Sequence, residues 1–141
     1  MSANEMPPEG SPCWIEIPAH DVPALKNFYA ALFPSWEWKP STEEYKPENI
    51  AMISFKQPSG LSGGIIKLPA DCVRDEQKNG VGFTVYFFAE SIEGIQAKIH
   101  ELGGKTCLEK TEQGKNGWYA NFTDPEGNRF GTYEVNLANM K

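Results

Sequence analysis

The chain has 141 residues, of which 40% are hydrophobic and 12% aromatic, and its formal net charge is −6 at pH 7. This size and composition indicate one folded domain with its own core, while the negative charge without a Lys/Arg stripe argues against nucleic acid or an anionic membrane as partner. Short apolar runs, an N-terminal segment without signal-peptide features and three widely spaced cysteines, typical of reduced thiols, predict a cytoplasmic protein with no membrane span.

The first half of the chain predicts a strand, a helix and further strands. Residues 1–11 are rich in Pro, Glu and Ser and predict a disordered tail. Asp21 precedes the helix as an N-cap residue, and Pro23 is tolerated because it falls in the first turn. The predicted elements are a strand over 13–17, a helix over 22–33, and strands over 50–56 and 63–68.

The second half repeats this order. Ser91 is the predicted N-cap of its helix, and Gly103 with Gly104 marks the helix end. Asp124, Pro125 and Gly127 occupy the positions that a type I turn prefers, which predicts a hairpin between the last two strands. The predicted elements are a strand over 82–88, a helix over 92–102, and strands over 105–109, 118–123 and 128–135.

The two helices carry the same apolar stripe, displaced by seventy positions. The matching residues are Val22, Leu25, Tyr29 and Leu32 in the first helix and Ile92, Ile95, Ile99 and Leu102 in the second. This spacing is typical of one buried helix face, so the chain predicts a duplicated βαβββ unit in an α+β fold with a cavity between the halves. The expected division is a single domain over 12–137, with module one over 12–70, a crossover over 71–80, module two over 81–136 and a tail over 138–141.

Three segments carry a family resemblance that covers about residues 13–136. The run from Trp14 to Pro18 with its helix, the Gly-rich 62–65, and the closing hairpin 117–131 resemble the vicinal-oxygen-chelate superfamily, which includes glyoxalase I, bleomycin-resistance proteins and extradiol dioxygenases. The glycine-rich segment resembles a glyoxalase-like subgroup. The resemblance implies two βαβββ modules that form a curved, half-barrel mixed sheet around a cleft. It also implies a homodimer as an option that the sequence leaves open.

The same resemblance predicts that the usual metal site is missing. Its ligand positions fall on Trp14, Phe83 and Gly131, and residues 49–70 contain no His, Asp, Glu or Cys. An indole, a phenyl ring and a glycine cannot hold a divalent cation. We therefore expect a cleft with no metal and no cofactor, and no metal-dependent glyoxalase I or dioxygenase activity.

Strand alternation predicts which side chains line the cleft. The predicted lining is Trp14, Glu16, Phe83, Val85, Phe87, Trp118, Arg129, Gly131 and Tyr133. Apolar walls with a few polar groups are the usual composition of a small-molecule pocket. Two interpretations stay open: a slot that stacks a small apolar or aromatic ligand, or rings that pack the cleft shut.

Glu16 is the candidate for chemistry. Beside Trp14 it would lose hydration, which favours the protonated carboxyl and suits proton transfer, but anchoring of the backbone or of Arg129, and hydrogen bonding to a ligand, remain alternatives. His20 and His100 are expected on the surface. Three functions follow: a metal-independent binding protein, a metal-independent isomerase, cyclase or lyase that uses Glu16 and Tyr133, or a metalloenzyme with ligands relocated to residues such as Glu16 and His20. Whether the protein is an enzyme is left open.

Overall fold

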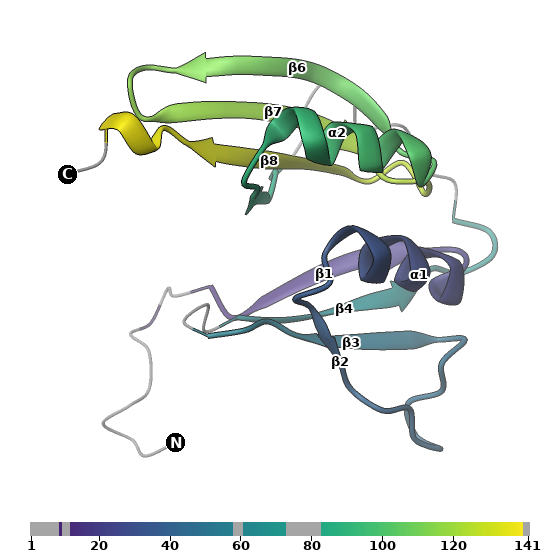
Figure 1. Cartoon of the computed structure of the whole chain (residues 1–141). Helices are drawn as coiled ribbons and strands as arrows, with labels where there is room; N and C mark the ends of the chain where they lie inside the picture. The colour runs from purple at the N-terminus through teal and green to yellow at the C-terminus, as the bar shows by residue number, and fades with distance from the viewer. Residues whose placement is uncertain (1–8, 10–11, 58–60, 73–82, 140–141) are drawn as a thin grey trace.

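A computed structural model of the chain describes residues 9, 12–57, 61–72 and 83–139, and it contains two four-stranded sheets that each carry one helix (Figure 1). The first module contains β1 (Trp14–Ala19), α1 (Val22–Leu32), β2 (Glu37–Trp38), β3 (Ile50–Ser54) and β4 (Ser62–Lys67). Its strand order is β1-β4-β3-β2, with β1 parallel to β4 and the other pairs antiparallel.

The second module repeats this topology. It contains β5 (Tyr86–Phe88), α2 (Ile92–Glu101), β6 (Lys105–Gln113), β7 (Gly117–Thr123) and β8 (Arg129–Val135), followed by the short 3₁₀ helix η2 (Leu137–Asn139). The strand order is β5-β8-β7-β6, and β5 is parallel to β8. The predicted α+β fold of two βαβββ modules is confirmed, and within the described part of the chain the sheets stay open rather than close into a barrel. No helix among the described residues is long and apolar enough to cross a membrane.

The predicted helix caps and turns are confirmed. The Asp21 carboxylate accepts from the Ala24 amide and the Ser91 hydroxyl from the Gly94 amide, each at 3.1 Å. Gly103 follows α2 with a φ of 97°, a left-handed conformation that favours glycine. These local contacts fix where both helices begin and where α2 ends.

Several strand boundaries differ from those predicted, most clearly in β1, β5 and β6, and β6 continues to Gln113 instead of ending at residue 109. β1 continues through Pro18, and its place at the edge of the sheet makes this proline tolerable. β5 begins only at Tyr86, so the described residues 83–85 precede the strand, while residue 82 lies outside the described residues. The expected crossover over 71–80 and the tail over 1–11 also fall mostly outside them and stay predictions.

The core joins the two modules through α1. Tyr29 stacks on Trp36 with ring centroids 5.1 Å apart, and Phe33 lies 5.1 Å from Trp36. Two rings of the second module complete this cluster: Phe130 lies 6.0 Å from Tyr29, and Phe87 lies 5.1 Å from Phe33. The helix of the first module is therefore packed by both halves of the chain.

The predicted turn between β7 and β8 connects the modules by hydrogen bonds. The buried carboxylate of Asp124 accepts from the Tyr29 hydroxyl at 2.7 Å, and the Glu126 carboxylate accepts from the amides of His20 and Asp21 at 3.1 and 3.0 Å. The Asn128 side chain donates to the Pro18 carbonyl at 3.0 Å. This turn therefore holds the second module against the start of α1 and the end of β1.

Candidate functional site

The two modules face each other along β1 and β5, which are the edge strands of their sheets. A pocket of about 580 Å³, here called the seam pocket, lies between these strands and is open to solvent. Six of the nine residues predicted to line a cleft line this pocket: Trp14, Glu16, Phe83, Val85, Phe87 and Arg129. The structure thus brings most of the predicted set together, although ligand binding by them stays a prediction.

A second pocket continues the same seam. It has a volume of about 510 Å³ and is here called the apolar pocket; its lining residues are Ile15, Phe55, Lys56, Leu61, Val85, Tyr86, Phe87 and Phe88. It shares Ile15, Val85 and Phe87 with the seam pocket. Both volumes fall in the usual range of small-molecule sites. The rings between the modules therefore leave space along the seam.

The sheet face predicted for Phe87 is wrong, although the residue does line the seam pocket. Phe87 was expected to share the cleft face with Phe83 and Val85, yet its ring packs into the core, 5.3 Å from Trp36 and 6.1 Å from Phe130. The residues opposite β8 on the cleft face are Tyr86, which pairs with Gly131, and Phe88, which pairs with Tyr133. Phe83 and Val85, which precede β5, line the seam pocket together with Phe87.

Trp118 lies on the other face of its sheet. It shares that face of β7 with the buried Ala120 and Phe122, and the Lys110 ammonium lies 4.5 Å from its ring centroid. Lys110 in turn forms an ion pair with Glu93 of α2 at 3.0 Å. The prediction that Trp118 lines the cleft is therefore wrong: its ring packs beside Lys110, which pairs with Glu93 of α2.

Two aromatic rings lie over glycines on the cleft face, one in each module. A Cβ at Gly64 would come within 2.9 Å of the Trp14 ring, and one at Gly131 would overlap the Tyr86 ring. Each ring therefore lies against the sheet where a side chain would otherwise project. Trp14 and Tyr86 keep 42% and 44% of their surface exposed, so each covers its glycine and presents apolar surface to solvent.

Tyrosine side chains that the sequence did not single out gather beside Tyr133. A shallow pocket of about 420 Å³, here called the tyrosine pocket, is lined by Tyr86, Gln113, Tyr119 and Tyr133. The Tyr133 hydroxyl donates to the Gln113 carbonyl oxygen at 2.5 Å, and the Asn121 amide donates to the Tyr86 hydroxyl at 3.0 Å. Side chains alternate between the two faces of β7, and the apolar Ala120 and Phe122 lie on the other face. This alternation was the sequence signal that could have placed Tyr119 here.

The polar candidates lie in different surroundings. The Arg129 guanidinium is half-buried, and it donates from Nη1 to Thr84 Oγ1 at 2.5 Å and from Nη2 to Asn121 Oδ1 at 2.8 Å. Glu16 is exposed on β1. No ion pair joins Glu16 and Arg129, both of which the structure describes, so the anchoring of Arg129 by Glu16 is not seen. Glu16 lines the seam pocket and Tyr133 the tyrosine pocket, so the proposed acid/base pair does not share a pocket.

The donor set does not fit the divalent metal that the resemblance implies. Of the three ligand positions, Trp14 offers an indole, Phe83 a phenyl ring and Gly131 no side chain, and the Tyr86 ring lies where a side chain at 131 would project. Among the described residues, no three His, Cys, Asp or Glu side chains gather closely enough to hold a metal ion. His20 and His100 are exposed, as predicted, and the His100 ring is 2.7 Å from the Thr106 hydroxyl.

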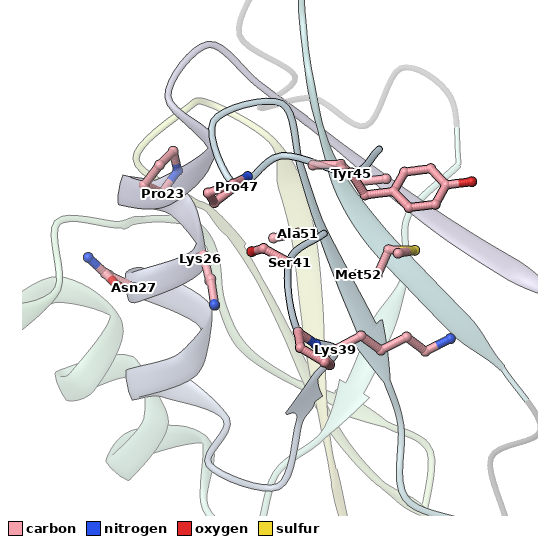
Figure 2. A pocket seen from close by; sticks show the side chains of 11 residues that line it. Pro23, Lys26, Asn27, Lys39, Ser41, Tyr45, Pro47, Ala51 and Met52 are labelled. Atoms are coloured by element: carbon pink, nitrogen blue, oxygen red, sulfur yellow. The ribbon is translucent and has the colours of Figure 1, made fainter. Parts of the chain in front are cut away.

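A smaller pocket of about 180 Å³ lies near the far edge of the first sheet, away from β1. Figure 2 shows that it is formed between α1, which carries Lys26, and the chain that carries Ser41 and Tyr45. The Lys26 ammonium lies 5.6 Å from the Trp38 ring centroid. None of the predicted cleft residues lines it, and its volume is below that of usual ligand sites.

Comparison with known proteins identifies the family of this architecture. A family model described as a glyoxalase-like domain matches residues 14–132, which is most of the chain. No curated protein sequence matches the chain. Solved structures with the same fold include a glyoxalase/bleomycin resistance protein/dioxygenase family enzyme from Burkholderia phytofirmans, with 16% identity and a TM-score of 0.66, covering 86% of this chain and 96% of that one.

Fosfomycin resistance proteins have the same fold. FosX from Listeria monocytogenes is 18% identical with a TM-score of 0.66, covering 91% of this chain and 93% of its own. A mutant of the same protein in complex with Mn(II) and dihydroxypropylphosphonic acid is 15% identical with a TM-score of 0.65, covering 92% of each chain. At these identities the likeness establishes the shared fold.

Proposed function

Because the chain belongs to the glyoxalase-like domain family, we propose that it binds a small, planar aromatic molecule along the seam between its modules without a metal. The observation that carries the proposal is the pair of rings on the cleft face, Trp14 over Gly64 and Tyr86 over Gly131. A ring held against a sheet is already ordered, so stacking a ligand on it costs little additional side-chain entropy. The apolar walls of the seam pocket and the apolar pocket would cover the ligand's remaining surface.

The proposal is metal-independent because of the chemistry of the side chains. The FosX structure with Mn(II) illustrates that a protein of this fold can hold a cation. In this chain the resemblance puts the ligand positions on Trp14, Phe83 and Gly131, and the Tyr86 ring covers Gly131. Binding by stacking is therefore favoured over chemistry on a metal-bound substrate. We place this function in the cytoplasm, and a homodimer stays a prediction.

Binding of a planar aromatic probe tests the proposal. We would titrate a panel of naphthalene and anthraquinone derivatives into the full chain and measure affinity by isothermal titration calorimetry. Trp14→Ala should weaken binding about tenfold, the effect of losing roughly 1.4 kcal/mol of stacking and burial. Trp118→Phe is the matched control, because Trp118 lies on the opposite face beside α2, and it should keep the affinity.

Two outcomes would contradict the proposal. The first is a panel in which no planar compound binds the folded protein. The second is an equal loss of affinity in Trp14→Ala and Trp118→Phe, which would place the ligand elsewhere or indicate a general loss of structure. Circular dichroism of both variants separates these causes.

A further inference from the structure

We propose that the ligand is an aromatic compound that carries a carboxylate, and that Arg129 binds this carboxylate in the seam pocket. The inference rests on the proposed function and specifies the class of its ligand. It begins from the position of Arg129 at the first residue of β8, beside the apolar side chains of Phe83, Val85 and Phe87. A positive charge is thus placed in an otherwise largely apolar wall.

Neutral groups hold the guanidinium in place. Its two described hydrogen bonds go to the Thr84 hydroxyl and the Asn121 carbonyl oxygen. Asn121 is only 1% exposed, and its own amide donates to the Tyr86 hydroxyl, which fixes the direction of its oxygen. Arg129 is therefore oriented by partners that leave its charge uncompensated.

The remaining donors of Arg129 support the same conclusion. An arginine has five N–H donors in a planar fork that matches a carboxylate. Nη1 and Nη2 each donate one hydrogen bond, to Thr84 and Asn121. Nε is buried and has no hydrogen-bond partner among the residues that the structure describes. A half-buried cation with unused donors is costly unless an anion pairs with it, and a ligand carboxylate would supply that anion.

The negative charges of the protein do not remove this preference. Glu16 lines the same pocket but is exposed to solvent on β1. The net charge of −6 acts over long distances, which salt screens with a Debye length of about 8 Å. The attraction between the guanidinium and a carboxylate in direct contact with it, in a pocket that excludes part of the solvent, is screened much less. This contact therefore decides which sign of ligand charge is preferred.

A matched pair of neutral and anionic ligands tests the inference. We would compare naphthalene-2-carboxylate with naphthalene-2-carboxamide, which has nearly the same shape, and measure both affinities by calorimetry at low and high ionic strength. The carboxylate should bind at least about tenfold more tightly to the wild-type protein, and the preference should shrink as salt increases. Arg129→Gln should remove the preference while the carboxamide keeps its affinity.

The control is Lys26→Gln, because Lys26 lines the small pocket near the far edge of the first sheet, outside the proposed site, and should leave the preference unchanged. Equal binding of the two compounds to the wild-type protein would overturn the role of Arg129 but leave stacking intact. A preference lost in Lys26→Gln and kept in Arg129→Gln would also overturn it. Failure of both compounds to bind the wild-type protein would contradict the proposed function itself. The wild-type comparison stands even if Arg129→Gln does not fold.

Discussion

Helices α1 and α2 carry the same apolar spacing, yet they are buried to different extents. Five residues of α1 are buried, against Ile92 and Ile99 in α2. The counterparts of the buried Leu25 and Leu32 are Ile95 and Leu102, which are only partly buried against the core. α1 packs on its own sheet and also receives Phe87 and Phe130 and the turn at Asp124 from the second module.

This difference shows that a duplicated pattern specifies which face of a helix is apolar but not how deeply the other module covers it. The extra cover on α1 comes from residues far away along the chain, as in the contact of Tyr29 with Asp124, 95 positions apart. The packing between the modules is therefore asymmetric: α1 packs against both halves of the chain, whereas α2 packs mainly on its own sheet.

The largest predicted effect tests this asymmetry at a matched pair. Leu25→Ala removes a side chain that is 1% exposed and should lower the free energy of unfolding by about 2–5 kcal/mol. Ile95→Ala, at the same position of the repeat, should cost less, roughly 1–2 kcal/mol, because Ile95 already contacts solvent. Urea denaturation followed by circular dichroism measures both, and equal losses would show that the modules support each other symmetrically.

The next effect concerns the glycines under the aromatic rings. Gly131→Ala would place a Cβ where the Tyr86 ring lies, so the ring must move. We expect a loss of about 1–3 kcal/mol, the usual cost of overpacking. Tyr86→Ala in the same chain should recover part of this loss, because it removes the obstructing ring. Thermal and urea denaturation of the single and double variants measure this coupling.

Gly94→Ala provides the control for that experiment. Its new Cβ would meet Ser91 at an ordinary distance of 3.5 Å within α2, and alanine favours a helix. Stability should therefore stay the same or rise slightly. Additive effects of Gly131→Ala and Tyr86→Ala would contradict direct contact between the ring and residue 131.

Local signals allowed much of the fold to be predicted. Asp21 and Ser91 were recognisable as caps because their side chains bond amides three residues away, and Gly103 because only glycine adopts its φ easily. The turn at Asp124 was equally local, and its Gly127 amide donates to the Asp124 carbonyl at 2.9 Å. What these signals share is that both partners lie within a few residues.

The errors arose where the sequence has no such signal. Residues 83–88 place apolar side chains at both odd and even positions, so alternation could not decide which set faces the cleft. Trp118 was misplaced because a large ring suits either face of a sheet. The Arg129 contacts with Thr84 and Asn121 join β8 to β7 and to the segment before β5, which spacing alone does not reveal.

The smallest predicted effect tests the contact that makes α1 different. Burial raises the pKa of Asp124 above its ordinary value of 3.8, and hydrogen bonds from Asn128, Tyr29 and Glu126 oppose this only in part. The folded state then binds the proton more tightly than the unfolded state, so the Asp124 contribution is fully present below pH 3.8 and declines as the pH rises through the folded pKa. Above that pKa it should be constant.

The difference in unfolding free energy between the wild-type protein and Asp124→Asn isolates this contribution, because most other carboxylates titrate alike in both. Measured by urea denaturation across the acidic range, the difference should fall with rising pH and then level off. Tyr29→Phe should move the decline to higher pH, since the Tyr29 hydroxyl lowers the pKa of Asp124. A difference that grows with pH would mean that the hydrogen bonds outweigh burial, and that the contact between modules stabilises the ionised carboxylate.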